Sequence, residues 1–330
     1  MKAHIAVYAS LFVVVVAVAS FIPSRAQGAG SGPQQPPTGK GAPPANPLKV
    51  ALLKWYQANQ APTRFDAGSE PVGLAFDGAN IWAADYGAGT VTKLRANDGA
   101  KLGTFAVGDN PFGLAFDGAN IWVANSYSNT VTKLRASDGK NLGTFAVGKQ
   151  PYMVAFDGTS IWVTNSLGNS VSKLRVRDGK VLGTFPLSGP SGIAFDGAYI
   201  WVASWNGVGN AVKLKTDGTV VGSYKVGDAP LGVAFDGANI WVANLDSGTV
   251  SKLRARDGVN LGTFNISDSP RYVAFDGTNI WVSTFNALVY ELRDSDGVTL
   301  GYFSGGDEGV AFDGASVWIA SFDRNEVTKF

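Results

Sequence analysis

The tetrapeptide Ala-Phe-Asp-Gly recurs seven times in this chain of 330 residues. Its copies begin at Ala75, Ala115, Ala155, Ala194, Ala234, Ala274 and Ala311, at spacings of 40, 40, 39, 40, 40 and 37 residues. A unit of this length cannot bury a core alone, so neighbouring copies must stack against one another. The period therefore restricts residues 63–330 to an array of similar units.

Each repeat contains four short runs that are typical of β-strands. In the second repeat we expect strands at residues 111–116, 121–125, 130–135 and 142–147, with Asp-Gly turns between two of the pairs. Gly and Asp-Gly recur too often for repeated helices. Four strands per repeat predict one blade of a β-propeller, and seven repeats predict an all-β, seven-bladed propeller of four-stranded antiparallel blades.

The two ends of the repeat region complement each other. Residues 63–68 (TRFDAG) align with residues 103–108 (GTFAVG), the last strand of the first repeat, whereas the final repeat stops at Phe330 after its third strand. We therefore expect the N-terminal strand to complete the last blade and close the ring. Closure would remove the exposed sheet edges that otherwise favour aggregation.

Three segments precede the repeats. Residues 1–26 combine Lys2, an apolar run at 5–22 and small residues at a cleavage position, which indicates a signal peptide and a secreted or periplasmic protein. The apolar run is also long enough to span a bilayer, so an uncleaved membrane anchor with the domain facing outward is the alternative. Residues 27–47 are rich in Pro and Gly and predict a flexible linker. Residues 48–62 are expected as a short helix packed on the domain, or as an extended segment.

Composition excludes several classes of function. The chain has no Cys, which removes disulfides, iron–sulfur clusters and Cys nucleophiles, and its one histidine, His4, lies in the predicted signal peptide. Lys and Arg total 27 against 26 Asp and Glu, so the charge balance gives no reason to expect nucleic acid or an acidic membrane as a partner. A closed ring needs no assembly, and we expect a monomer.

Residues that occur in every repeat are expected to be structural, because one active site does not need seven copies. The repeated aspartates are expected to bond their own turn, with calcium ligation as the alternative; they are Asp77, Asp117, Asp157, Asp196, Asp236, Asp276 and Asp313. The repeated tryptophans are expected to pack the blades; they are Trp82, Trp122, Trp162, Trp201, Trp241, Trp281 and Trp318. The Lys-Leu-Arg run, for example Lys133 and Arg135, is expected to form a solvated strand edge with a few ion pairs.

Function is expected where the repeats differ, in the loops around one mouth of the central channel. Polar and aromatic side chains in these loops suit a protein, sugar or small organic ligand, while the alternative is that they only cap the channel. The candidate ligand-binding residues are Asp85, Tyr86, Phe112, Asn125, Tyr152, Asn165, Trp205, Asn244, Arg271, Phe285 and Phe322.

The same loops are rich in carboxylates. Glu70, Asp85 and Glu308 belong to the first and last repeats, which the closed ring would make neighbours, and oxygen ligands suit a hard cation. They are the candidate metal ligands, with calcium or magnesium as the expected ion, and no other cofactor is expected. The alternative is that terminal repeats simply depart from the consensus.

The repeat P-x-G-[LV]-A-F-D-G-x-N-I-W-V-A-N, followed by N-x-V-[TS]-K-L-R and D-G-x-x-L-G-T-F-x-V-G, resembles NHL and YVTN-type propellers. It is most similar to exported bacterial repeats related to streptogramin lyase, over residues 63–330. Those lyases are metal-dependent and use a catalytic histidine, so the resemblance transfers no catalytic residue to this chain. Two functions follow: an exported binding or interaction propeller without catalysis, or a metal-dependent lyase or lactonase that uses carboxylates at the channel mouth.

Overall fold

The computed structural model describes residues 62–330 except 206–208 and 267, and the predicted signal peptide, linker and segment 48–61 lie outside the described residues. The described residues form strands and no helix, so none of them belongs to a helix that could cross a membrane. The strands are β1 (Thr63–Asp66), β2 (Pro71–Phe76), β3 (Asn80–Asp85), β4 (Thr90–Arg95), β5 (Lys101–Ala106), β6 (Pro111–Phe116), β7 (Asn120–Asn125), β8 (Thr130–Arg135), β9 (Asn141–Ala146), β10 (Pro151–Phe156), β11 (Ser160–Asn165), β12 (Ser170–Arg175), β13 (Val181–Pro186), β14 (Pro190–Phe195), β15 (Tyr199–Ser204), β16 (Asn210–Lys215), β17 (Val220–Lys225), β18 (Pro230–Phe235), β19 (Asn239–Asn244), β20 (Thr249–Arg254), β21 (Asn260–Asn265), β22 (Pro270–Phe275), β23 (Asn279–Thr284), β24 (Leu288–Arg293), β25 (Thr299–Ser304), β26 (Val310–Phe312), β27 (Val317–Ser321) and β28 (Glu326–Lys329).

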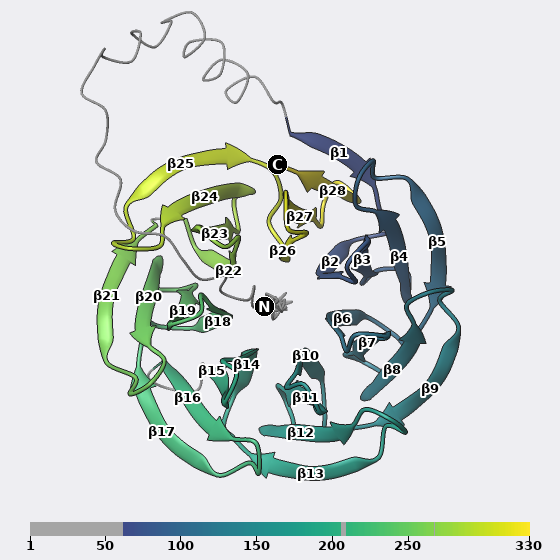
Figure 1. The fold of residues 1–330 in the computed structure, drawn as a ribbon, viewed down its shortest axis with the longest axis horizontal. Coiled ribbons are helices and arrows are strands. Elements are labelled where there is room, and N and C mark those ends of the chain that lie inside the picture. Colours follow the sequence, from purple (N-terminus) through teal and green to yellow (C-terminus); the bar gives the residue numbers. More distant parts are fainter. Residues whose placement is uncertain (1–61, 206–208, 267) are drawn as a thin grey trace, which may run out of the picture.

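These strands form seven four-stranded antiparallel sheets arranged as a ring (Figure 1). Blades 1 to 6 are β2–β5, β6–β9, β10–β13, β14–β17, β18–β21 and β22–β25, and blade 7 contains β26, β27, β28 and β1. The first strand of each blade faces the centre of the ring and the fourth forms its outer wall. The expected all-β, seven-bladed propeller is confirmed.

Blade 7 combines strands from both ends of the described chain. β1 pairs antiparallel with β28, with Thr63 opposite Lys329 and Asp66 opposite Glu326. The Phe65 ring lies 5.4 Å from the Trp318 ring of the same blade. That this pairing holds the ring closed stays a prediction.

The repeated aspartate organises the turn between the first two strands of each blade. In blade 1, Asp77 Oδ1 accepts hydrogen bonds from the backbone N–H groups of Ala79 (2.9 Å) and Asn80 (2.7 Å). The next residue, Gly78, has a φ of 96°, which a side chain would strain. The repeated aspartates are therefore turn residues, as expected, and the recurring Gly follows from the turn geometry.

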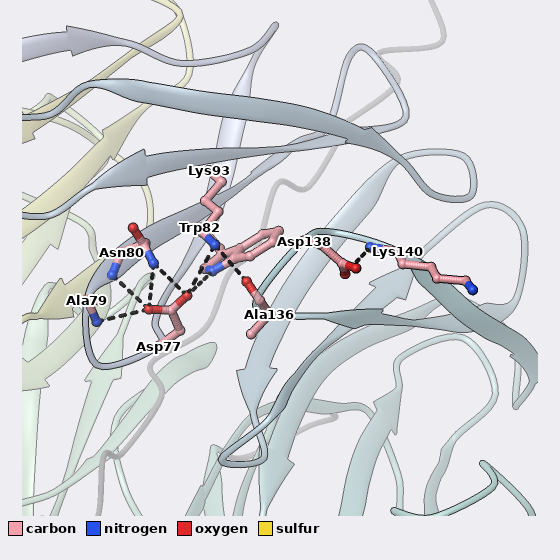
Figure 2. A network of polar contacts seen from close by, with 8 residues as sticks. All are labelled: Asp77, Ala79, Asn80, Trp82, Lys93, Ala136, Asp138 and Lys140. Carbon is pink, nitrogen blue, oxygen red and sulfur yellow. Dashed lines mark hydrogen bonds and ion pairs between the residues drawn. The ribbon is translucent and has the colours of Figure 1, made fainter.

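The same carboxylate also connects the turn to the buried tryptophan and to a lysine (Figure 2). Asp77 Oδ2 accepts a hydrogen bond from Trp82 Nε1 at 2.8 Å, and Lys93 Nζ lies 3.9 Å from that oxygen and 4.9 Å from the centre of the Trp82 ring. Lys93 Nζ then donates to the backbone carbonyl of Ala136 in blade 2, at 2.6 Å. One lysine thus joins two neighbouring blades, and we call each such side chain an inter-blade lysine.

Six blades contain an inter-blade lysine that bonds a carbonyl of the next blade; these are Lys93, Lys133, Lys173, Lys213, Lys252 and Lys329. Lys133 is buried, whereas Arg135, two residues along, is exposed and pairs with Asp138 at 3.0 Å. The expectation of a solvated edge was therefore wrong for the lysine and correct for the arginine. The two side chains share a face of the strand, and they differ because Lys133 lies over the Trp122 ring and bonds the next blade, whereas Arg135 is the last residue of β8.

The seam can be tested with a matched pair of substitutions. Phe65 and Phe105 occupy equivalent fourth-strand positions, each with its ring 5.4 Å from the tryptophan of its blade. If β1 holds the ring closed, Phe65→Ala and Phe105→Ala each lower the free energy of unfolding by about 2–4 kcal/mol. Urea denaturation measures both; a loss confined to Phe105→Ala would show that β1 contributes little.

The inter-blade lysines make a second prediction. Lys133 Nζ donates to Val176 O at 2.7 Å and lies 5.1 Å from the Trp122 ring centre. Lys133→Met removes both contacts and leaves the carbonyl unpaired, so we expect a loss of about 1–3 kcal/mol in unfolding free energy. Lys140→Met, at an exposed turn, is the control and changes it by less than about 0.5 kcal/mol. Equal effects would contradict the role given to Lys133.

Candidate functional site

The loops that carry the sequence variation meet at one face of the ring, which we call the loop face. In each blade the loop before the first strand bonds the loop after the second: Tyr86 N donates to Glu70 O at 3.1 Å, and Ser126 N donates to Asn110 O at 2.9 Å. Glu70 and Asn110 have φ values of 53° and 48°, in the left-handed region. This conformation is uncommon for residues other than Gly, Asn and Asp, so at Glu70 it is imposed by the pairing of the two loops.

The expected ring of small polar ligands does not face solvent. Asn125 is buried; its Oδ1 accepts from Gly108 N at 3.1 Å, and its Nδ2 donates to Thr130 at 3.0 Å and Thr132 at 2.8 Å. Asn165 and Asn244 are buried at the equivalent positions. These candidate ligand-binding residues instead brace the loops, because buried amides need hydrogen-bond partners.

Asp85 replaces the asparagine in blade 1 and has the same role. Its carboxylate accepts hydrogen bonds from Gly68 N (3.0 Å), Thr90 (2.7 Å) and Thr92 (2.8 Å). Burial raises the pKa of Asp85, while the bonds from Thr90, Thr92 and Gly68 act in the opposite direction. Asp85 is therefore a structural carboxylate rather than a ligand-binding one.

The centre of the channel is filled by candidate residues as well. The Phe112 and Tyr152 rings are buried and stack with their centres 4.7 Å apart. Tyr152, in blade 3, interacts electrostatically with Tyr272 and Arg271 of blade 6 and with Glu308 before blade 7. Blades 3 and 6 are not neighbours in the ring (Figure 1). The interactions of Tyr152 with Arg271 and Tyr272 therefore reach across the channel. We call Phe112, Tyr152, Arg271, Tyr272 and Glu308 the channel plug; Phe112, Tyr152 and Arg271 were expected at the mouth and lie below it.

A contact between Arg271 and Glu308 lies inside the channel plug. Arg271 Nη1 contacts Glu308 Oε1, and the same nitrogen lies 3.8 Å from Asp307 Oδ2. The Arg271 guanidinium also covers the Phe285 ring at 4.5 Å. Complete burial raises the pKa of Glu308 to about 8, although the nearby Arg271 acts to lower it.

Glu70, Asp85 and Glu308, the candidate metal ligands, do not form one group in the structure. Glu308 contacts Arg271 and Asp85 is bonded inside blade 1, whereas the Glu70 carboxylate lies over Gly87. Across residues 62–330, leaving out 206–208 and 267, no group of three His, Cys, Asp or Glu side chains could hold a metal ion. The Asp85 and Glu308 carboxylates have partners within the protein, and the binding of calcium or magnesium stays a prediction.

The loop face also carries large apolar side chains, one from each loop after a second strand, and four of them are exposed while Tyr86, Leu245 and Phe322 are half-buried. We call them the apolar rim; its members are Tyr86, Tyr127, Leu167, Trp205, Leu245, Phe285 and Phe322. Tyr127, Leu167 and Phe285 are 67%, 65% and 60% exposed. Exposed apolar side chains gathered on one face make it a candidate interaction surface.

The candidate residues predicted from the sequence include four members of the rim and leave out Leu245, Tyr127 and Leu167. The sequence comparison used only the first loop position, where blades 2 and 3 have the buried Ser126 and Ser166. In these two blades the large apolar residue stands one position later. The pattern that would have identified them is one large apolar residue in every loop, at either the first or the second position after the second strand.

Two hollows lie on the opposite face, between blades. One, of about 470 Å³, is lined by Asp196, Lys213 and Phe235, and the other, of about 560 Å³, by Asp77, Lys93 and Phe116. The Asp and Lys side chains there already bond the tryptophan and the next blade. These hollows therefore follow from blade stacking and offer few uncommitted polar groups.

Comparisons with known proteins identify the fold alone. No model of a protein family matches the chain, and no curated protein matches it. Among solved structures it is similar to Kuenenia stuttgartiensis hydrazine synthase, with a TM-score of 0.68 and 18% sequence identity, over 83% of this chain and 98% of that one. At this identity the likeness supports a shared propeller architecture and carries no activity across.

The channel plug predicts a pH dependence of stability. Because the pKa of Glu308 rises from 4.5 to about 8 on folding, the folded state binds a proton that the unfolded state releases between these values. This contribution is complete below pH 4.5 and is lost as the pH rises through 8. We expect urea midpoints of the wild type to fall between pH 5 and 8, and those of Glu308→Gln to fall less. Parallel slopes would contradict the assignment.

Proposed function

We propose that this protein is an exported binding propeller without catalytic activity, and that its partner docks on the apolar rim. The observation that carries the proposal is the set of large apolar side chains on one face, of which Tyr127, Leu167 and Phe285 are the most exposed, beside loops that Asn125 and Asp85 brace from within. A rigid propeller scaffold suits such a surface, because packed sheets hold the loops in position.

Several further assignments belong to the same proposal. Export rests on the apolar run and cleavage-like residues within 1–26, and assignment to NHL or YVTN-type repeats rests on the recurring motif. We propose that the protein acts as a monomer, since each blade finds both its neighbours within the ring. A protein, sugar or small organic ligand can each bury such a rim.

No observation favours the alternative of a metal-dependent lyase or lactonase. Asp85 and Glu308 are the carboxylates on which that reaction would depend. Asp85 accepts three hydrogen bonds and Glu308 contacts Arg271 within the channel plug. Neither faces an open site where a substrate could reach it, since both side chains are buried.

The proposal is tested with two matched variants. The rim variant carries Tyr127→Ser, Leu167→Ser and Phe285→Ser, and the control carries Leu142→Ser, Leu182→Ser and Leu261→Ser, which are exposed on outer strands. Biolayer interferometry measures binding of each purified protein to immobilised cell-envelope material from the source organism. We expect the rim variant to bind at least about tenfold more weakly and the control to bind like the wild type.

Circular dichroism verifies that both variants fold. If the rim variant binds as well as the wild type, or if both variants lose binding equally, the apolar rim is not the docking surface and the proposal fails.

A further inference from the structure

We propose that the partner on the apolar rim is a basic polypeptide segment, whose Lys and Arg side chains bind between the rim residues and a set of neighbouring carboxylates. This inference rests on the proposed function and names the chemistry of its partner. It comes from the charge that surrounds the rim, which the overall composition does not reveal.

Carboxylates lie beside the rim residues because the paired loops bring them there. Tyr127 N donates to Asp109 O at 3.3 Å, so the backbones of the two residues are adjacent, and Asp109 is exposed. Glu70 Oε2 lies over Gly87, the neighbour of Tyr86: a methyl group there would come within 2.8 Å of it. An acidic group therefore accompanies the rim residues of both blade 1 and blade 2.

The same holds in blades 5 to 7. Asp246 and Asp323 are exposed and directly follow the rim residues Leu245 and Phe322. In blade 6, Asp268 accepts hydrogen bonds from Asn286 and Tyr290 in the loop and strand after Phe285. Blade 5 adds the exposed Asp228, whose N–H bonds Ser247.

These carboxylates form one continuous stretch of the ring, from blade 5 through the seam to blade 2 (Figure 1). We call this set the acidic arc; its members are Glu70, Asp109, Asp228, Asp246, Asp268 and Asp323. Two basic side chains lie at the loop face in the same stretch: Arg324, which is 3.7 Å from Glu326, and the buried Arg271, which contacts Glu308. Blade 3 instead presents the exposed Lys149, so the rim is acidic on one side and not on the other.

Aromatic faces beside carboxylates select cations. A Lys or Arg group gains attraction from an aromatic face and from the surrounding negative field at once, whereas an acidic partner would be repelled. Phe285 already receives the Arg271 guanidinium, 4.5 Å from its ring centre, and is still 60% exposed. The apolar rim residues between the carboxylates would bury the aliphatic stems of the bound Lys and Arg side chains.

A polypeptide fits this surface better than a small cation. The carboxylates are spread over five blades, so one small ligand cannot reach more than a part of them. A chain with several basic residues can contact them together, and simultaneous contacts raise its effective affinity. A neutral sugar would gain nothing from the acidic arc.

The test uses fluorescein-labelled nona-arginine as the probe and nona-glutamate as its opposite, with binding to the full-length protein followed by fluorescence anisotropy. The arc variant carries Asp109→Asn, Asp246→Asn and Asp323→Asn. The control carries Asp98→Asn, Asp138→Asn and Asp178→Asn, the same charge change at exposed turns on the opposite face.

We expect nona-arginine to bind, nona-glutamate not to bind, and affinity to fall as salt is raised. The arc variant should bind roughly tenfold more weakly or worse, and the control within about twofold of the wild type. Tyr127→Ser should also weaken binding, because the cation loses an aromatic face.

Three results would overturn the inference: nona-arginine binding no better than nona-glutamate, equal loss in the arc and control variants, or tight binding of a neutral oligosaccharide that the arc variant retains. Light scattering tests for self-association. If the wild type associates as its concentration rises and the arc variant does not, the partner on the acidic arc is a second copy of this chain rather than a basic segment. In each of these cases the proposed function would still hold if the rim variant lost its binding to envelope material and the matched outer-strand control did not.

Discussion

The architecture depends on how a buried lysine is accommodated between two blades. In blade 1, Lys93 has little access to water, so its charge needs partners within the protein. It finds the Trp82 face, the Asp77 carboxylate and the carbonyl of Ala136 in the next blade. The first two partners belong to the same repeat and the third to its neighbour. A contact that each repeat can satisfy only with the next one favours a ring of stacked blades.

Blade 6 shows what happens where this contact is missing. Glu291 stands in place of the lysine and accepts a hydrogen bond from Asn279 at 2.7 Å. The Trp281 ring packs instead against Phe330, with the ring centres 5.9 Å apart. Aromatic packing thus replaces a cation at the junction between blades 6 and 7. This junction between blades 6 and 7 therefore differs chemically from the other six, because aromatic contacts take the place of a buried lysine.

Most of the fold could be predicted from the sequence, and most of the site could not. The strands of the second repeat were placed within one residue of β6 to β9, because Asp-Gly turns and β-branched runs are local signals. Asn125 and Phe112 were placed at the correct end of the ring but with the wrong exposure. Whether a loop side chain points to solvent or back into a hydrogen-bonded corner depends on the opposing loop, which lies some seventeen residues away in the chain and leaves no periodic pattern.

The channel plug explains why the negative charge of the loop face lies at its edge rather than at its centre. Glu308 lies at the centre, but Arg271 contacts it and burial favours its neutral form up to a pH of about 8. The central carboxyl therefore adds little negative charge to the face. Asp109, Asp246 and Asp323 are exposed, so their charges act directly on an approaching partner. A chain of almost balanced charge can in this way direct a basic partner to one side of one face, because attraction depends on where its charges lie rather than on their sum.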